Sequence, residues 1–108
     1  MKTAIGIDIG GTITKIGLVS EEGVCIKKTS FRTKEETSFS SYINKLVNSI
    51  NLIVGEEKIL GIGIGAPNAS KNGTIETPAN LKWSGKLNLV KDLREKLNYK
   101  IHLSNDAN

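Results

Sequence analysis

The chain has 108 residues, of which 38% are hydrophobic and 24% charged, with eleven glycines and two prolines; this composition predicts one modest core and argues against intrinsic disorder. The net charge is +4, but the basic residues are scattered from Lys2 to Lys100 and aromatic residues are few, which argues against a nucleic-acid-binding surface. The single cysteine, Cys25, excludes an internal disulfide and a multi-cysteine zinc site within this segment.

The sequence gives no sign of export or of a membrane span. Met1-Lys2-Thr3 leads directly into a strand pattern, without the apolar region and small-residue cleavage site of a signal peptide. The longest mostly apolar run, at residues 59–66, is too short and too rich in glycine to cross a bilayer. We therefore expect a cytoplasmic protein without membrane contact.

The first third of the chain has the pattern of three consecutive strands. Residues 3–9 are rich in isoleucine and lead into Gly10-Gly11, where two glycines permit a tight turn. Residues 13–20 resume a β-type composition, Glu21-Glu22-Gly23 forms a second turn, and residues 24–31 can form a third strand. An antiparallel meander is the simplest arrangement.

A helix follows, because apolar residues then recur at intervals of three and four. They are Phe39, Tyr42, Ile43, Leu46, Val47, Ile50, Ile53 and Val54. Thr33 with Glu36 can form a capping box at its start, and Thr37 or Ser38 is a competing start. Gly55 is a natural end.

The remainder of the chain predicts strands alternating with a second helix. Residues 58–65 have the short apolar run of a buried central strand, and residues 74–76 can add a brief one. Leucines at helical spacing follow Asn88, a plausible cap, and residues 100–103 form the last strand.

The predicted order is therefore βββαβαβ, which is typical of an α/β fold: a mixed sheet with a three-strand meander and helices packed on it. Residues 1–108 form a single lobe, with no internal repeat or linker. In such sheets, ligands gather at the carboxyl ends of strands.

The segment Asp8-Ile9-Gly10-Gly11-Thr12 has the residues of a phosphate site. Glycines at a strand–turn–strand junction let backbone N–H groups approach a phosphate closely, and the Thr12 hydroxyl adds a donor. Asp8 can hold a hydrated magnesium ion. A plain hairpin turn explains the same residues equally well. The segment matches neither the P-loop nor the Rossmann pattern.

Two further segments end predicted strands. Between Gly61 and Gly65, glycines alternate with isoleucines, so one face of that strand is nearly bare and a ligand, a backbone or a helix can come close. After the last strand, Asp106 can take a proton from a substrate hydroxyl and Asn105 can orient that substrate. Ser-Asn-Asp is also common in turns and helix caps.

Two single residues are weaker candidates for a role at the site. Asn80 has the donor and the acceptor that a sugar-hydroxyl ligand requires, and Trp83 can line a pocket. A loop asparagine and a packed tryptophan are the alternatives. We expect His102 to be a partly buried strand residue and Cys25 to lie in the core, rather than either acting in catalysis.

Together and in this order, these segments resemble the ROK family of repressors, open reading frames and kinases, within the actin-like ATPase superfamily. The matching stretches are IGIDIGGT at 5–12, KIGLV at 15–19, GIGIGAP at 61–67, ANLKW at 79–83 and LSNDAN at 103–108. The resemblance implies a ribonuclease H-like amino-terminal lobe and a cleft in which ATP and a hexose meet.

On the nucleotide side, the resemblance implies that Gly10, Gly11 and Thr12 contact the ATP phosphates and that Asp8 serves Mg²⁺. Ile13 departs from the family, which often has lysine there. Lys15 lies two residues on, and so on the same strand face.

On the sugar side, the resemblance implies that Gly65 lies at the substrate and that Asn80 and Asn105 hold sugar hydroxyls. Asp106 would be the general base for the hydroxyl that attacks the γ-phosphate. Asn68 departs from the usual glycine after the proline, but asparagine tolerates the left-handed conformation better than most residues.

A second lobe, with the adenine site, further sugar-binding residues and a cysteine-rich zinc motif, is implied beyond residue 108. The chain is then the first lobe of a glucokinase-like sugar kinase and is inactive by itself. The alternatives are the sugar-sensing part of a ROK repressor and an actin-like ATPase of another branch. Repressors carry a helix-turn-helix before the DIGGT strand, and here Met1 lies close to Asp8, which favours the kinase. The sugar and the oligomeric state stay open, and a homo-oligomer is compatible.

Overall fold

A computed structural model of the chain describes residues 2–35, 38–67, 69–70, 72–76 and 86–105. The elements, in chain order, are β1 (Thr3–Ile9), β2 (Ile13–Ser20), β3 (Cys25–Arg32), the short 3-10 helix η1 (Thr33–Glu35), α1 (Phe39–Val54), β4 (Ile59–Ala66), β5 (Ile75–Glu76), β6 (Lys86–Leu87), α2 (Leu89–Arg94) and β7 (Ile101–Asn105).

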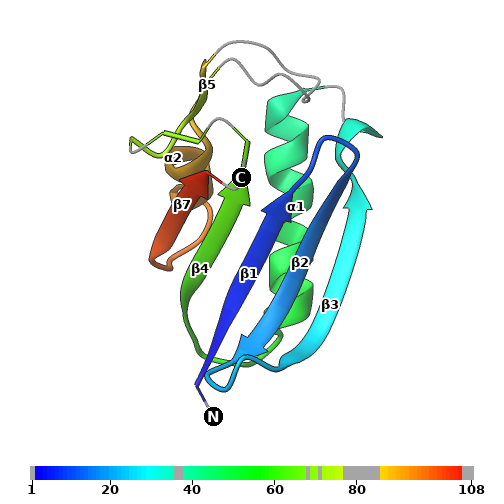
Figure 1. The fold of residues 1–108 in the computed structure, drawn as a ribbon, viewed down its shortest axis with the longest axis vertical. Coiled ribbons are helices and arrows are strands. Elements are labelled where there is room, and N and C mark those ends of the chain that lie inside the picture. The colour runs from blue at the N-terminus through cyan, green and yellow to red at the C-terminus, as the bar shows by residue number, and fades with distance from the viewer. Residues whose placement is uncertain (1, 36–37, 68, 71, 77–85, 106–108) are drawn as a thin grey trace.

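Five strands form one mixed sheet in the order β3-β2-β1-β4-β7 (Figure 1). β1 is antiparallel to β2 and β2 to β3, which confirms the predicted meander. β4 is parallel to β1, and β7 is parallel to β4. β5 and β6 form a separate small antiparallel sheet. Sequence analysis missed β6, because two residues are too few to show a period.

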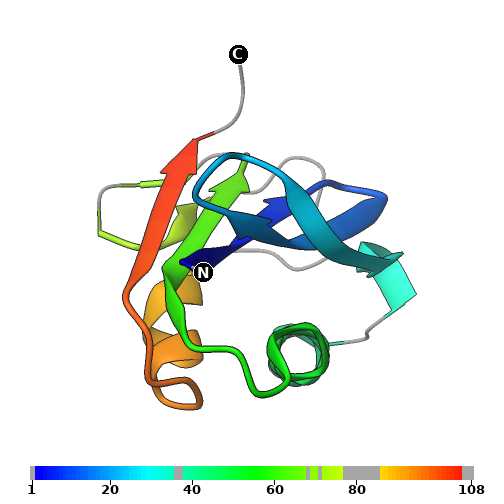
Figure 2. The same ribbon diagram turned by 90° about the horizontal axis from the view of Figure 1, so that it is seen from below.

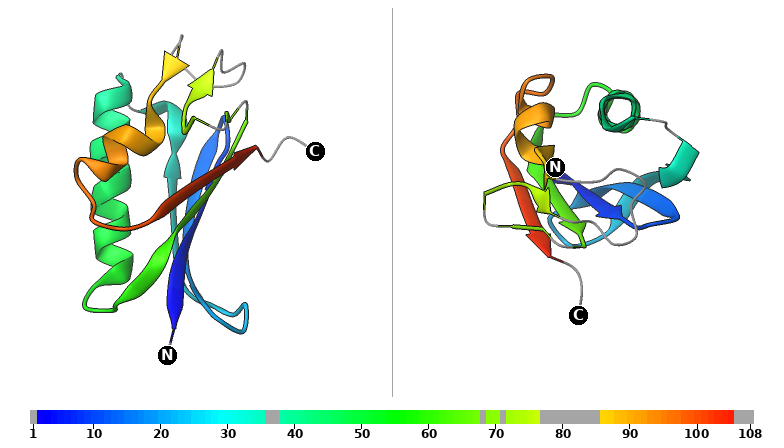
Figure 3. Two further views of the ribbon diagram at one scale, coloured as in Figure 1. Left: turned by 90° about the vertical axis from the view of Figure 1, so that its left-hand side faces the viewer. Right: turned by 90° about the horizontal axis from the view of Figure 1, so that it is seen from above.

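Both helices cover the same face of the sheet, because the strands direct their branched side chains to that side. In β1, Ile5, Ile7 and Ile9 are buried, whereas Gly6 and Asp8 between them are exposed. α1 and α2 lie together against the buried face (Figures 2 and 3). In the described part of the chain, the opposite face of the sheet carries no helix.

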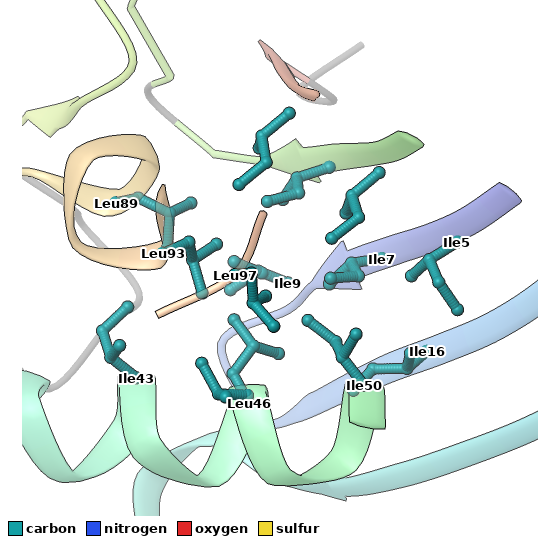
Figure 4. Packing of buried hydrophobic residues seen from close by; sticks show 14 of the residues in the cluster. Ile5, Ile7, Ile9, Ile16, Ile43, Leu46, Ile50, Leu89, Leu93 and Leu97 are labelled. Carbon is teal, nitrogen blue, oxygen red and sulfur yellow. The ribbon is translucent and has the colours of Figure 1, made fainter. Parts of the chain in front are cut away.

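The apolar stripe of α1 forms the centre of the core (Figure 4). Ile43, Leu46 and Ile50 point from α1 toward the isoleucines of β1 and β2 and toward the leucines of α2 and the turn that follows it. Leu46 is fully buried, and Leu52, on the opposite face of α1, is 82% exposed. The predicted stripe is confirmed.

The capping box predicted at Thr33 is wrong. Thr33 belongs to η1, and its hydroxyl donates to the carbonyl of Gly10 instead of capping a helix. The competing start is confirmed: Ser38 is the N-cap of α1, and its side chain accepts a hydrogen bond from the N–H of Ser41. Gly55 ends the helix at a positive φ of 57°, as predicted.

The second helix and the last strand differ from the prediction at their ends. α2 ends at Arg94, and Asn88 occupies the N-cap position without a side-chain cap hydrogen bond. Leu97 is still buried, because the turn after α2 directs it into the core. β7 continues past residue 103 to Asn105, which pairs with Ala66 of β4. Within the residues described, no helix has the length and apolar character of a membrane span.

Candidate active site

Three of the predicted site residues meet at one edge of the sheet. β1, β4 and β7 run parallel, so their carboxyl ends lie at the same edge (Figure 1). Asp8 pairs in register with Gly65, and the neighbouring Ala66 pairs with Asn105. Asp8 and Asn105 are exposed. The order of strands, rather than the sequence distance, brings Asp8, Gly65 and Asn105 to neighbouring positions.

A hollow of about 840 Å³ lies on the open face of the sheet, beside this edge. Three glycines form a row across it, since Gly6 pairs with both Gly17 on β2 and Gly63 on β4. Residues without side chains leave the backbone uncovered there. The bare face predicted for the strand that contains Gly63 is therefore confirmed, and it extends over β1 and β2.

Two charged side chains line the hollow where it meets the edge. Lys15 lies directly opposite Asp8 in the β1–β2 ladder, and both are exposed. Ile13 lines the same hollow, which confirms that Ile13 and Lys15 share a strand face. The edge therefore offers a carboxylate and an ammonium group on adjacent strands.

The turn between β1 and β2 depends on the small size of Gly10 rather than on a positive φ. The N–H of Gly10 donates to the carbonyl of Ile13 at 3.0 Å. A tight two-residue hairpin turn uses glycine for its positive φ, but neither Gly10 nor Gly11 has a positive φ. A Cβ on Gly10 would lie 2.8 Å from the carbonyl oxygen of Ile13, too close for any side chain.

Gly10→Ala should therefore lower the free energy of unfolding of the chain by about 1–3 kcal/mol, because the new methyl group meets backbone. Urea unfolding followed by circular dichroism measures this. Gly6→Ala is the matched control, since a Cβ there meets no atom within 4 Å and the alanine restricts the unfolded chain. Equal stabilities of the two variants would contradict the tight packing of the turn.

A chain of three hydroxyl groups lies beneath this turn, on the core side of the sheet. The hydroxyl of Thr33 lies 2.8 Å from that of Thr14, which in turn lies 2.8 Å from the phenol of Tyr42. All three residues are buried. Thr33 donates from its hydroxyl to the carbonyl of Gly10 at 2.7 Å and from its N–H to the carbonyl of Thr12 at 3.0 Å.

Aromatic rings surround the phenol of Tyr42. The ring centroids of Phe31 and Phe39 lie 5.7 Å and 6.1 Å from that of Tyr42. Lys45, which is paired with Glu35 at 3.5 Å, lies over the Phe31 ring. Burial raises the pKa of Tyr42 well above its usual value, and the hydrogen bond to Thr14 opposes this only in part. The phenol is therefore neutral and keeps its hydrogen as a donor.

The sequence contains a signal for this hydroxyl chain that our sequence analysis did not use. The buried face of β2 reads Thr14, Ile16, Leu18 along alternate positions, and a threonine in such a series needs a hydrogen-bond partner. Tyr42 likewise interrupts the apolar stripe of α1 with a polar atom. The identity of the partners depends on how the helix docks on the sheet.

The residues at the edge fit a magnesium ion and a phosphate, as the chemistry of the donors shows. Asp8 supplies an exposed carboxylate next to Gly65, which has no side chain to exclude a hydrated ion. Mg²⁺ in phosphate-transfer sites commonly binds one or two carboxylates and keeps its waters. The described residues contain no group of three or more His, Cys, Asp or Glu side chains that could hold a metal by themselves.

Two expectations about single residues are wrong. Cys25 is exposed on β3, a strand in which most residues face solvent, and does not lie in the core. His102 is exposed on β7, because its neighbour in register is Gly63, on the open face of β4. The predictions for Asn68, Asn80, Trp83 and Asp106 concern positions outside the described residues.

Known proteins are similar to this chain in sequence and in the arrangement of its elements. The chain is 32% identical over 106 residues to a glucokinase of Thermotoga maritima, which covers 96% of this chain and 33% of the relative. A ROK family glucokinase from Streptomyces griseus, solved with glucose and AMPPNP, has a TM-score of 0.83 at 24% identity, over 98% of this chain and 34% of that one. A ROK family transcriptional regulator, a homologue of the E. coli MLC protein, has a TM-score of 0.81 at 15% identity, over 97% of this chain and 28% of that one.

The chain thus spans about a third of the length of the relatives that it matches. The structural likeness confirms the expected α/β fold, a mixed sheet with helices packed on it. The sequence profile of the ROK family matches residues 4–108, which is nearly the whole chain. On this match, the chain belongs to the ROK family.

Proposed function

We propose that this chain is the first lobe of an ATP-dependent kinase that phosphorylates a hydroxyl group of a hexose in the cytoplasm. One observation carries the proposal: the Gly10–Thr12 turn, Asp8 and Asn105 lie together at one edge of the sheet. A phosphate at the turn and a sugar at the end of β7 would then be neighbours. The identity of 32% to a glucokinase supports a hexose as the substrate.

On the nucleotide side, Gly10, Gly11 and Thr12 would contact the ATP phosphates, with the backbone N–H groups of Gly11 and Thr12 as donors, because the N–H of Gly10 is already bonded to the carbonyl of Ile13. Asp8 would hold Mg²⁺ through its carboxylate, and Lys15, opposite it, would add positive charge. When bound, Mg²⁺ supplies neutralisation of the charge that develops on the phosphate oxygens. Because the row of glycines has no side chains, the nucleotide could approach the open face of the sheet closely.

On the sugar side, Asn80 and Asn105 would hold sugar hydroxyls, and Gly65 would let the sugar come close to the strand end. Asp106, the next residue after Asn105, would accept the proton of the attacking hydroxyl. A carboxylate in this role transfers a proton and leaves the positioning of the phosphate to the other groups.

A coupled assay of ADP release tests the proposal on the full-length protein, with ATP, Mg²⁺ and a panel of hexoses. We expect turnover with at least one hexose, and none from residues 1–108 alone, because half of a two-lobed cleft cannot exclude water. Hexose binding without turnover in the full-length protein would instead support a sugar-sensing regulator. A ROK transcriptional regulator has the same fold, with a TM-score of 0.81, which is why the assay must distinguish the two functions. A full-length protein that neither binds a hexose nor phosphorylates one would overturn both functions.

A further inference from the structure

Thr33 contacts the turn between β1 and β2 twice, although it follows β3. Its hydroxyl lies 2.7 Å from the carbonyl oxygen of Gly10, and its N–H lies 3.0 Å from that of Thr12. Thr33 is fully buried. Two of the peptide groups in the turn, the one after Gly10 and the one after Thr12, are therefore held by one residue from a different part of the chain.

The direction of the hydroxyl chain follows from counting hydrogens. Each hydroxyl has one hydrogen to donate. Thr33 donates its hydrogen to the Gly10 carbonyl, so Thr14 donates to Thr33 and Tyr42 donates to Thr14. This is the arrangement in which all three contacts are hydrogen bonds. Hydrogen bonds in such a chain polarise and strengthen one another, and the chain ends on the turn.

The Gly10 carbonyl also determines where the next N–H points. The peptide group is planar, and the described residues contain no cis peptide bond, so the N–H of Gly11 points opposite to the C=O of Gly10. Because that C=O points to the buried Thr33, the N–H of Gly11 points away from the core, toward the side of the sheet on which Asp8 is exposed. A phosphate near Asp8 would meet this N–H.

We propose that Thr33 is a positioning residue for nucleotide phosphates: it orients the Gly10–Gly11 peptide so that its N–H points outward before the ligand arrives. Thr14 and Tyr42 support it from below. This inference rests on the proposed function, because it assumes that the turn binds the phosphates of ATP. Because the peptide is already oriented, ATP binding does not include the entropic cost of ordering the turn.

The test compares Thr33→Val with Thr33→Ser in the full-length protein. Valine removes the hydroxyl at nearly constant shape, and serine keeps it. Calorimetry measures the Kd of ATP and of adenosine, which has no phosphate, and the ADP-release assay gives KM for ATP and for the hexose. We expect Thr33→Val to raise the Kd and the KM for ATP about tenfold and to leave the Kd for adenosine and the KM for the hexose unchanged. In Thr33→Ser, all of these constants should remain within about threefold of the wild type.

Thr3→Val is the matched control, because it makes the same chemical change at another buried threonine. The Thr3 hydroxyl, at the far end of β1 from the turn, has no hydrogen-bond partner among the described residues. Its replacement should leave ATP affinity unchanged. This control separates a role at the turn from the general effect of a buried threonine.

Two results would overturn the inference: ATP affinity that is unchanged in Thr33→Val, or an equal loss of ATP and adenosine binding, which indicates a merely structural role. The proposed function fails in a different way. If the wild type binds ATP but transfers no phosphate to any hexose, the tenfold effect of Thr33→Val on ATP alone would still support the positioning role. A wild type that does not bind ATP would overturn both.

Discussion

Asp106→Asn in the full-length protein should lower kcat for hexose phosphorylation by about 10²–10⁴-fold, because asparagine cannot accept the proton of the attacking hydroxyl. KM for the hexose should change little, since the amide keeps the size and the hydrogen-bonding capacity of the side chain. The ADP-release assay at saturating ATP measures both constants. This expectation rests on the proposed kinase function.

Asp92→Asn is the matched control for that variant. Asp92 lies on α2, on the helical side of the sheet, and takes no part in the proposed site. Its replacement should leave kcat within about twofold of the wild type. A value for Asp106→Asn within the same range would show that another group accepts the proton.

Leu46→Ala should lower the free energy of unfolding by about 2–5 kcal/mol, because it leaves a cavity at the centre of the core. Leu46 is fully buried where α1 packs on the sheet, beside the leucines of α2 and of the turn that follows it (Figure 4). Urea unfolding of this chain, followed by the circular dichroism of its helices and strands, gives the difference. A loss of this size is a large fraction of the total stability of a small domain.

Leu52→Ala is the control within the same helix. Leu52 is 82% exposed, so its truncation removes few contacts and should change the stability by less than about 0.5 kcal/mol. The two variants change helix propensity equally, and their difference therefore reports packing alone. Similar losses in both would mean that α1 does not dock through the stripe that contains Leu46.

The features of the fold that depend on neighbouring residues were predicted correctly. The strands around Ile5 and Ile16 and the helix around Leu46 were predicted from periodicity, because alternation and helical spacing are properties of the neighbouring residues. Element ends were less certain. α1 begins after Ser38 and not at Thr33, because the hydroxyl of Thr33 donates to the carbonyl of Gly10 and is not available as a helix cap.

At the candidate site, too, the residue types were predicted from the sequence, whereas their proximity depends on the fold. The residue types predicted that Asp8 holds a magnesium ion and that Asn105 orients a substrate, but the proximity of the two residues depends on β1, β4 and β7 being parallel neighbours. The exposure of Cys25 and His102 was mispredicted, because exposure of a strand residue depends on which face the helices cover. No pattern along one strand contains that information.

Residues close together in the chain specify the main strands and helices, the glycine-bare face and the motifs that mark membership of the ROK family. The packing of the fold, in contrast, brings the hydroxyl of Thr33 to the carbonyl of Gly10 and places Thr14 between Thr33 and Tyr42. These residues are far apart in sequence, and hydrogen bonds between them form only when η1 and α1 pack against the end of β2. A buried hydroxyl must find a partner, and the fold alone decides which partner is within reach.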